Sequence, residues 1–264
     1  MNINFASTSQ TGARETNQDE TGALPGEHRA CFLVCDGVAG NEGGGKAAEL
    51  ARDALLTQLA VDAPLNPEET AGWIAIAEQA IHQAQQNNPN FAHMSTTLAA
   101  LFIDRDDPRA WWVHAGDSRI YHFRRGFIHR VTRDHSLVQQ MKDAGYENTG
   151  INSNLLYNAL GVAGSQPVSY SEVMPLEDGD VFLLCTDGFW CSLTSQEMEQ
   201  ALRMVNSPQE WLALMQKAIN RSEKNDNLSA VAVWVGSPQE TTLFQSMADS
   251  ARFLPPRKSQ QGTL

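Results

Sequence analysis

Apolar residues in this chain gather in short runs rich in β-branched and aromatic side chains, and Gly, Asp or Asn bound each run. Such runs are typical of buried β-strands. Several are joined by only a few turn residues, which favours antiparallel hairpins over a parallel sheet. The predicted strands are Ala30–Cys35, Thr97–Ile103, Trp111–Ala115, Arg119–Phe123, Phe127–Val131, Asp180–Cys185 and Leu228–Val235.

Helical spacing of apolar residues falls between the strand groups. Asn66 and Ser207 are good N-caps, and a proline at the first helical position follows each of them. The predicted helices are Lys46–Ala60, Pro67–Gln86, Ser136–Ala144 and Pro208–Ile219. Two helices early in the chain and others late predict an α+β fold, in which helical layers enclose two mainly antiparallel sheets.

The ends and the connections of the predicted elements define the domain organisation. The pattern fades from Ser237 onward, so we predict one domain over residues 1–240 and a flexible C-terminal extension over 241–264. The Asn- and Gly-rich stretch Ala144–Pro167 is predicted to be a mobile flap. Met1–Gln10 lacks the features of a signal peptide, and no apolar run approaches the roughly 18 residues of a membrane span, so we expect a cytoplasmic protein.

Charge and cysteine content exclude several classes of partner and site. The 264 residues include 31 acidic and 19 basic side chains, a formal charge of −12, which repels nucleic acid and anionic lipid. We therefore expect neither nucleic acid nor a membrane as a partner. Cys31, Cys35 and Cys185 lie in apolar runs and are predicted to be buried thiols, and no Cys-x-x-Cys pair indicates a zinc or redox site.

Four aspartates stand in turns next to the ends of predicted strands: Asp36, Asp117, Asp187 and Asp226. A single Asp-Gly pair is more often an ordinary turn. Carboxylates that several strand ends project into one region, however, form an oxygen-rich site suited to Mg²⁺ or Mn²⁺, and such a cluster requires cations to offset its own repulsion. Gly37 leaves its backbone carbonyl accessible as a further ligand.

The amino-terminal stretch adds a positive charge to these acids. Arg14 is suited to bind a phosphoryl group with two parallel hydrogen bonds, and Asp19 is suited to hold metal-bound water. An arginine close to an aspartate is, taken alone, more often a surface ion pair. A cysteine-based phosphatase would need a Cys-x₅-Arg cradle, and the sequence contains none.

Several segments, in this order, resemble the type 2C family of protein phosphatases, the metal-dependent class also called PPM. The matching segments are Arg14–Asp19, Val34–Gly40, Met94–Thr97, Gly116–Arg119, Val131–Ser136, Ala159–Gly161, Leu184–Gly188 and Asn225–Asn227. The resemblance covers about residues 5 to 236. It implies a four-layer α-β-β-α sandwich with the metal site at one edge. The short chain resembles stand-alone bacterial members that accompany a Ser/Thr kinase, including those encoded with type VI secretion systems.

The resemblance also implies roles for individual residues. Asp36 corresponds to the carboxylate that bridges two metal ions, and Gly37 to the residue whose carbonyl binds one of them. Asp187 and Asp226 correspond to the remaining ligands of the pair. Asp117 corresponds to a residue that binds a third, weaker ion in bacterial members.

The implied activity is hydrolysis of phosphoserine and phosphothreonine in proteins by a water that bridges two Mn²⁺ or Mg²⁺ ions. In this scheme Arg14 binds the phosphate and Asp19 orders metal-bound water. The implied partners are phosphorylated proteins and a cognate cytoplasmic Ser/Thr kinase, and we expect a monomer. Val38 stands where some eukaryotic members have a histidine proposed as general acid, so the resemblance does not identify the proton donor.

Three other interpretations compete at particular residues. Gly40–Lys46 matches a phosphate-binding loop of nucleotide hydrolases, but Ala47 occupies the Ser/Thr position of that motif. Asp134 is predicted to cap the following helix, with His135 bracing the core, rather than to form a hydrolase triad. A family member without catalytic activity, acting as a binding or sensing module, remains an alternative function; the intact set of acidic residues argues against it.

Overall fold

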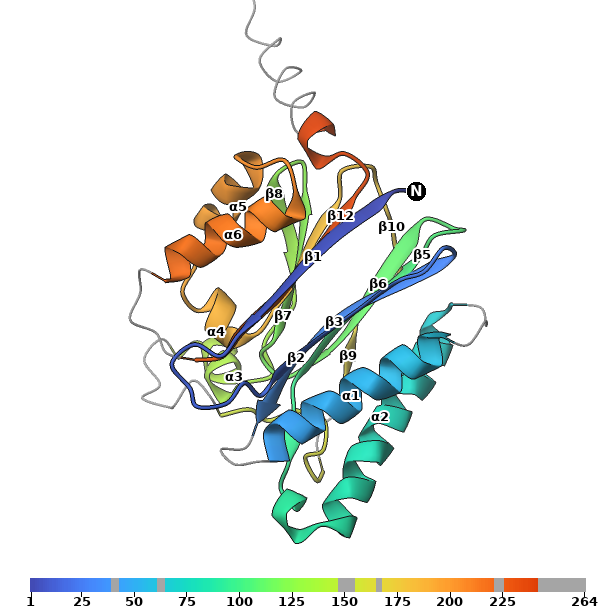
Figure 1. The fold of residues 1–264 in the computed structure, drawn as a ribbon, viewed down its shortest axis with the longest axis vertical. Coiled ribbons are helices and arrows are strands. Elements are labelled where there is room, and N and C mark those ends of the chain that lie inside the picture. Colours follow the sequence, from blue (N-terminus) through green and yellow to red (C-terminus); the bar gives the residue numbers. More distant parts are fainter. Residues whose placement is uncertain (39–42, 61–64, 147–154, 165–167, 221–225, 242–264) are drawn as a thin grey trace, which may run out of the picture.

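Two antiparallel β-sheets lie face to face between layers of helices in this computed structural model (Figure 1). The structure describes residues 1–38, 43–60, 65–146, 155–164, 168–220 and 226–241. This arrangement confirms the predicted α+β sandwich with an α-β-β-α order of layers. Every strand pair in the described part of the chain is antiparallel, which excludes the parallel sheet of a nucleotide hydrolase.

One sheet has five strands and the other has seven. The five-stranded sheet runs in the order β1 (Ile3–Gln10), β12 (Leu228–Val235), β11 (Val181–Cys185), β7 (Arg119–Arg124) and β8 (Phe127–Val131). The seven-stranded sheet runs in the order β10 (Met174–Pro175), β6 (Arg109–Ala115), β5 (Leu98–Asp104), β3 (Arg29–Val38) and β2 (Asp19–Pro25), with β4 (Ser95–Thr96) beside β3 and β9 (Ser169–Tyr170) beside β6.

The helices cover the outer faces of the sheets. The seven-stranded sheet is covered by α1 (Gly43–Ala60) and α2 (Pro67–Asn87), which continues into the short 3₁₀ helix η1 (Pro89–Phe91). The five-stranded sheet is covered by α4 (Asp187–Trp190), α5 (Ser195–Arg203) and α6 (Pro208–Ile219). A further short helix, α3 (Leu137–Asp143), follows β8. No helix in the described ranges has the length and apolar content to cross a membrane.

Strand periodicity divides the interior into three apolar layers. In β3, Phe32 and Val34 point between the sheets, whereas Cys31, Leu33 and Cys35 point toward the helices. This alternation is the period of two expected for a strand buried on both faces. Cys31, Cys35 and Cys185 are buried free thiols, as predicted.

The predicted strands and helices are all present. Of the described elements that were not predicted, η1, β4, β9, β10 and α4 have only two to four residues, and three others are longer. Strands β1 and β2 and helix α5 were missed. In β1 most side chains are exposed or half-buried, since the strand lies at a sheet edge, so it lacks the apolar run that marks the central strands. Helix α5 begins at a capping box of Thr194 and Glu197, which is a readable start signal.

The predicted role of Asp134 is wrong, whereas that of His135 agrees with the structure. Asp134 does not cap α3; its carboxylate accepts two hydrogen bonds of 2.7 Å from Arg119, and the Ser136 hydroxyl caps the helix instead. His135 is buried and stacks on His114, in agreement with a bracing role. Part of the predicted flap (147–154 and 165–167) and nearly all of the predicted extension (242–264) lie outside the described residues.

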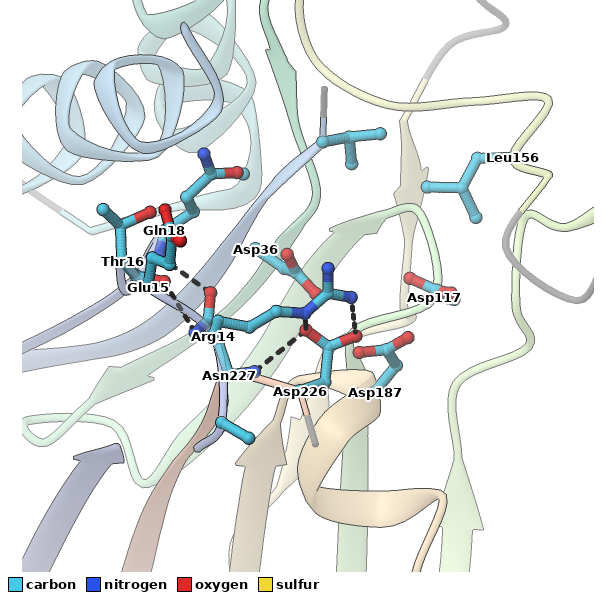
Figure 2. Close-up of a pocket in the computed structure, with 13 residues that line it drawn as sticks. Arg14, Glu15, Thr16, Gln18, Asp36, Asp117, Leu156, Asp187, Asp226 and Asn227 are labelled. Atoms are coloured by element: carbon cyan, nitrogen blue, oxygen red, sulfur yellow. Dashed lines mark hydrogen bonds and ion pairs between the residues drawn. The ribbon is translucent and has the colours of Figure 1, made fainter. Parts of the chain in front are cut away.

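Both sheets contribute to a common edge at one end of the sandwich. Asp19 at the start of β2 lies opposite Asp36 near the end of β3, in register. From the other sheet, β11 leads directly into α4 at Asp187, and β12 begins just after Asp226. Figure 2 shows Asp36, Asp187 and Asp226 facing a common space at this edge.

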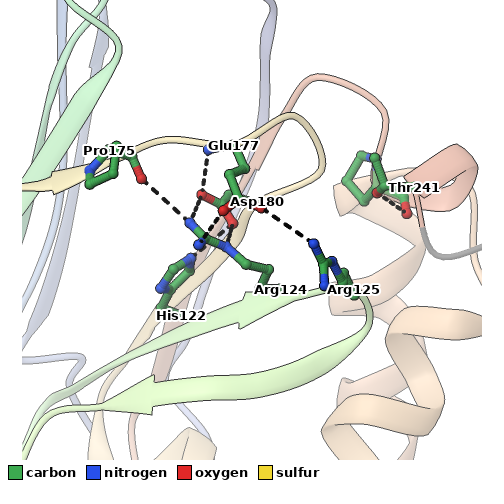
Figure 3. A network of polar contacts seen from close by, with 8 residues as sticks. His122, Arg124, Arg125, Pro175, Glu177, Asp180 and Thr241 are labelled. Atoms are coloured by element: carbon green, nitrogen blue, oxygen red, sulfur yellow. Dashed lines mark hydrogen bonds and ion pairs between the residues drawn. The ribbon is translucent and has the colours of Figure 1, made fainter. Parts of the chain in front are cut away.

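A buried ionic network joins β7 to the turn before β11 (Figure 3). The Asp180 side chain is fully buried and accepts hydrogen bonds from Arg124 at 2.7 and 2.8 Å and from the Glu177 amide at 2.9 Å. Nε2 of His122 lies 3.0 Å from the same carboxylate. Burial acts to raise the pKa of Asp180, but the contacts with His122 and Arg124 outweigh it and lower that pKa.

We expect Asp180→Ala to lower the free energy of unfolding by roughly 3 kcal/mol, because Arg124 and the Glu177 amide would lose their buried acceptor. Urea unfolding of the variant and the wild type at pH 7 measures this difference. Asp106→Ala, which removes an exposed carboxylate paired with His28, is the matched control and should change stability by less than about 0.5 kcal/mol. Equal stability of the Asp180 variant and the wild type would contradict the prediction.

Candidate metal centre

A cavity of about 590 Å³ opens at the edge where the two sheets meet. Its polar lining is dominated by carboxylates, and one guanidinium extends across it (Figure 2). The structure brings together six of the seven residues singled out in the sequence along this lining: Arg14, Asp36, Gly37, Asp117, Asp187 and Asp226. The seventh, Asp19, is buried beside them, since it pairs with Asp36 across the two strands.

Asp36 is held by its neighbours through backbone contacts. Its amide donates to the Thr97 hydroxyl at 2.9 Å, and its carbonyl accepts from the Thr96 hydroxyl at 3.0 Å and from the Thr97 amide at 2.8 Å. The amide of Gly37 donates to the Gln18 carbonyl at 3.1 Å. These bonds fix the backbone on both sides of Asp36, so that its carboxylate is directed toward the cavity.

Close approach of helix α1 explains the glycine at position 37. A Cβ atom placed on Gly37 would lie 2.3 Å from the carbonyl carbon of Gly44 in α1. A Cβ on Gly44 would in turn lie 2.8 Å from the Gly37 oxygen. Any side chain at either position would force the helix away from the strand, so both glycines are required by packing and not by a turn.

A second close approach brings Asp187 and Asp226 together. Asp187 is the first residue of α4, and a Cβ atom on the next residue, Gly188, would lie 2.0 Å from the carbonyl oxygen of Asn227. The segment before β12 therefore packs directly on the start of α4. The Asp-Gly pair at 187–188 is a contact point between two segments 40 residues apart.

The Asn227 side chain organises the loop that carries Arg14. Its amide group donates to the carbonyls of Thr11 and Thr16 at 2.8 and 2.9 Å, and its oxygen accepts from the Gln18 amide at 2.9 Å. One side chain thus binds the loop at both ends. The position of Arg14 over the cavity depends on this contact across the whole length of the chain.

The Arg14 guanidinium pairs with Asp226 in a two-point contact. Its Nε and Nη2 atoms donate to the two carboxylate oxygens, each at 2.9 Å. The pair is accessible to solvent, with 59% of the Arg14 side chain and 37% of the Asp226 side chain exposed. The hydrogen bond to Asp226 is the largest cause of the raised pKa of Arg14.

Asp19 is buried at the junction of the sheets. The Thr186 hydroxyl donates to its Oδ2 atom at 2.9 Å, whereas its Oδ1 atom is buried without a hydrogen-bond partner in the part of the chain that the structure describes. Burial, and then the negative charges of Asp187 and Asp226, raise the pKa of Asp19 to about 7.

The other carboxylates at this edge are disturbed in the same direction. Burial first, and then the charges of Asp19 and Asp187, raise the pKa of Asp36 well above its ordinary value. Burial and the charge of Asp187 raise the pKa of Asp117, which is 8% exposed, to about 7. These shifts show that several like charges share one weakly solvated space.

The chemistry of this donor set fits a divalent cation. All the side-chain donors are carboxylates, which Mg²⁺ and Mn²⁺ prefer, and a cation among them would lower the repulsion that raises their pKa values. The unpartnered Oδ1 atom of Asp19 is a further acceptor at the site. In the side-chain positions described, no three His, Cys, Asp or Glu residues converge tightly enough to enclose one ion, and the Asp226 carboxylate is bound to Arg14.

Sequence reasoning did not assign a role to several residues that build the site. Gly188, Asn227 and Thr97 were read only as parts of motifs, and Trp190 was not singled out. Trp190 donates its indole N–H to the Asp117 carbonyl at 2.9 Å. A local signal existed only for Asn227, an uncharged residue next to Asp226 immediately before a buried strand.

The sequence matches the family profile of protein phosphatase 2C over residues 7–236. The serine/threonine phosphatase stp of Listeria welshimeri is 27% identical over 252 residues, which cover 90% of this chain and 95% of that protein. The protein phosphatase PhpP of Streptococcus pneumoniae is 31% identical over 183 residues, or 64% of this chain and 71% of that protein.

Solved structures of similar proteins share the fold. The serine/threonine phosphatase of S. agalactiae superposes with a TM-score of 0.78 at 24% identity, over 89% of this chain and all of that one. The catalytic domain of the phosphatase PstP, solved with two manganese ions, gives 0.77 at 25% identity, covering 89% and 99% of the two chains. PppA, described as a key regulatory component of T6SS in Pseudomonas aeruginosa, gives 0.75 at 25% identity over 88% and 97%. With its family profile, its carboxylate-lined edge and its layered fold, this chain belongs to the protein phosphatase 2C family.

Proposed function

We propose that this protein removes phosphate from phosphoserine and phosphothreonine in other proteins with the help of two divalent cations, Mn²⁺ or Mg²⁺. The carrying observation is the meeting of Asp36, Asp187 and Asp226 around one cavity, from three distant parts of the chain. Family membership and the phosphatase names of its relatives support the same activity.

Asp36, Asp187, Asp226 and the Gly37 carbonyl would hold the ion pair, and Asp117 a third ion. A pair of divalent cations supplies an activated water and neutralises charge on the phosphoryl oxygens. The protein's contribution is a set of acidic groups whose backbone is fixed before any ion binds, because the contacts at Asp36 and Gly188 do not involve the carboxylates.

Arg14 would bind the phosphoryl group of the substrate. Its guanidinium already presents two donors in a parallel fork to Asp226, and a phosphoryl group can accept the same two-point contact. Binding of a cation by Asp226 would free the Arg14 guanidinium for the substrate. Asp19, buried beside Asp36, would order water at the ion pair through its Oδ1 atom.

The partners follow from the chemistry. A protein that removes phosphate from serine and threonine acts on phosphoproteins that a Ser/Thr kinase has modified, so a cognate kinase completes the proposal. The similarity to PppA supports the narrower idea that the chain regulates a secretion-associated kinase pathway.

Release of phosphate from p-nitrophenyl phosphate with Mn²⁺ tests the proposed phosphatase activity. A folded, metal-bound protein without turnover would favour the alternative function, a binding or sensing module.

We expect Asp187→Asn to reduce turnover more than about 100-fold, because loss of a charged ligand weakens the ion pair. Steady-state assays with Mn²⁺, together with calorimetry of Mn²⁺ binding, measure both effects. Asp106→Asn removes a carboxylate from an exposed turn between β5 and β6 and is the control. Near-normal turnover of the Asp187 variant would refute the ligand assignment.

Arg14→Ala is expected to raise KM for a phosphorylated peptide about ten-fold with a smaller change in kcat, as loss of a charge-assisted contact to the substrate should. Arg14→Lys keeps the charge without the planar fork and should give an intermediate KM. The two variants are compared by initial rates over a range of peptide concentrations. An unchanged KM in the alanine variant would show that phosphate binds elsewhere.

The raised pKa values of Asp19 and Asp117 predict a pH-dependent effect of metal on stability. A carboxyl whose pKa rises from 3.8 in the unfolded chain to about 7 in the fold holds its proton more tightly when folded, so its contribution to stability falls as pH rises from about 4 to about 7. Cations reverse this penalty.

Thermal unfolding with excess EDTA or Mn²⁺ should therefore show a larger rise in Tm on adding Mn²⁺ at pH 8 than at pH 5.5. Part of this difference reflects competition between protons and the metal for the same carboxylates. The Asp106→Asn variant should show the wild-type pattern. An equal rise in Tm at the two pH values would contradict the electrostatic account.

A further inference from the structure

The turn that carries Asp117 is held by His135, which follows β8, and by Trp190 of helix α4. Gly116 adopts a φ of +95°. Its amide donates to the ring Nδ1 atom of His135 at 3.3 Å, and its carbonyl accepts from the His135 amide at 2.9 Å. These contacts fix one side of the turn. The carbonyl of Asp117, on the other side, accepts the indole N–H of Trp190 at 2.9 Å.

Trp190 belongs to the same helical turn as Asp187. Helix α4 spans only Asp187–Trp190, with the Trp190 amide bonded to the Thr186 carbonyl at 3.2 Å and the Cys191 amide to the Asp187 carbonyl at 2.9 Å. The indole bond therefore ties the backbone of one cavity aspartate to the short helix that begins with another. Asp117 and Asp187 are separated by 69 residues in the sequence, so the covalent chain alone does not set the distance between them.

Arg119 holds the indole ring in place from one of its faces. The Arg119 guanidinium carbon lies 3.3 Å from the ring centroid, a cation–π contact. Two bonds of 2.7 Å to Asp134 and one of 3.0 Å to the Tyr121 hydroxyl hold that guanidinium in place. The ring has little freedom to turn, so its N–H is directed at the Asp117 carbonyl.

A fixed connection is needed here because the two carboxylates repel each other. Asp117 and Asp187 line the same cavity, so their like charges oppose a close approach of the two side chains unless a contact between their backbone segments holds them together. The neighbouring cation Arg119 donates to both oxygens of Asp134 and lies over the indole ring that contacts the Asp117 turn.

From this geometry we infer that Trp190 is a positioning residue. Its indole N–H holds Asp117 at the distance from Asp187 at which both carboxylates reach the third divalent cation. The inference rests on the proposed function, since it assumes that both aspartates serve bound ions. It assigns Trp190 no contact with substrate or metal.

Trp190→Phe tests the inference, because phenylalanine keeps an aromatic ring for Arg119 and removes only the N–H. Mn²⁺ is titrated into the metal-free full-length protein by calorimetry, and free Mn²⁺ is followed by electron paramagnetic resonance. We expect the weaker binding event to lose about ten-fold in affinity and the tighter events to stay within about two-fold of the wild type. Turnover at saturating Mn²⁺ should stay close to wild type, while the Mn²⁺ concentration for half-maximal activity rises.

Trp211→Phe is a matched control. It removes an indole bond of similar length, 3.1 Å to the Met198 carbonyl, from the buried layer between α5 and α6. It should lower the thermal stability and leave Mn²⁺ binding unchanged. The same loss of Mn²⁺ affinity in both tryptophan variants would attribute the effect to general loosening and overturn the inference.

A double-mutant cycle adds a measurement that does not depend on overall stability. If Trp190 acts through Asp117, Trp190→Phe should cause no further loss of Mn²⁺ affinity in an Asp117→Asn background. A full additional loss there would overturn the inference, as would wild-type binding in the single variant. Should Trp190→Phe fail to fold, Arg119→Lys weakens the contact between the guanidinium and the face of the indole ring. An unchanged Mn²⁺ affinity of the weaker binding event in that variant would then overturn the inference.

The outcomes separate this inference from the proposed function. A wild-type protein that binds Mn²⁺ and hydrolyses p-nitrophenyl phosphate, next to a Trp190 variant of unchanged Mn²⁺ affinity, overturns only the role of Trp190. A wild-type protein with no turnover overturns the proposed function. A wild-type titration without any weaker event overturns the assignment of Asp117 to an ion, and this inference with it.

Discussion

Repulsion among carboxylates is the constraint on which the functional edge of this protein depends. Asp19, Asp36 and Asp117 each lie in a weakly solvated space and have raised pKa values, and the charge of Asp187 contributes to all three shifts. Folding alone does not favour such a cluster, because each group would be better solvated in the unfolded chain. The cluster is stable only when neighbouring backbone fixes it or when a cation offsets its charge.

The scaffold meets this constraint with contacts that leave the carboxylates available. Thr97 holds the Asp36 backbone, Gly188 lets the segment before β12 reach α4, and Asn227 binds both ends of the Arg14 loop. Arg14 supplies a cation that pairs with the Asp226 carboxylate at the cavity. An arginine in this place offsets part of the negative charge without filling the cavity, which is compatible with its proposed role of binding phosphate.

Much of the fold could be predicted because the central strands carry their own signal. Strands such as β3 and β12 are buried on both faces and read as continuous apolar runs. Edge strand β1 has a half-exposed pattern and was missed, and β2, whose seven residues include two acids and a glycine, was missed too. Asp134 was assigned to a helix cap from its position in the sequence, whereas in the fold Arg119 reaches it from β7.

The sequence by itself determined the layered α+β fold, the acidic character of one edge and the family to which the chain belongs, because strand periodicity and motif order are local properties. Only the tertiary structure decided that Arg14 pairs with Asp226, that Gly37 and Gly188 are contact points between segments, and that Trp190 meets the Asp117 turn. Except for the contact of Gly37 with nearby Gly44, these contacts join residues that are far apart in the sequence. Their geometry follows from how two sheets and their helices pack, and no local pattern of residues encodes that packing.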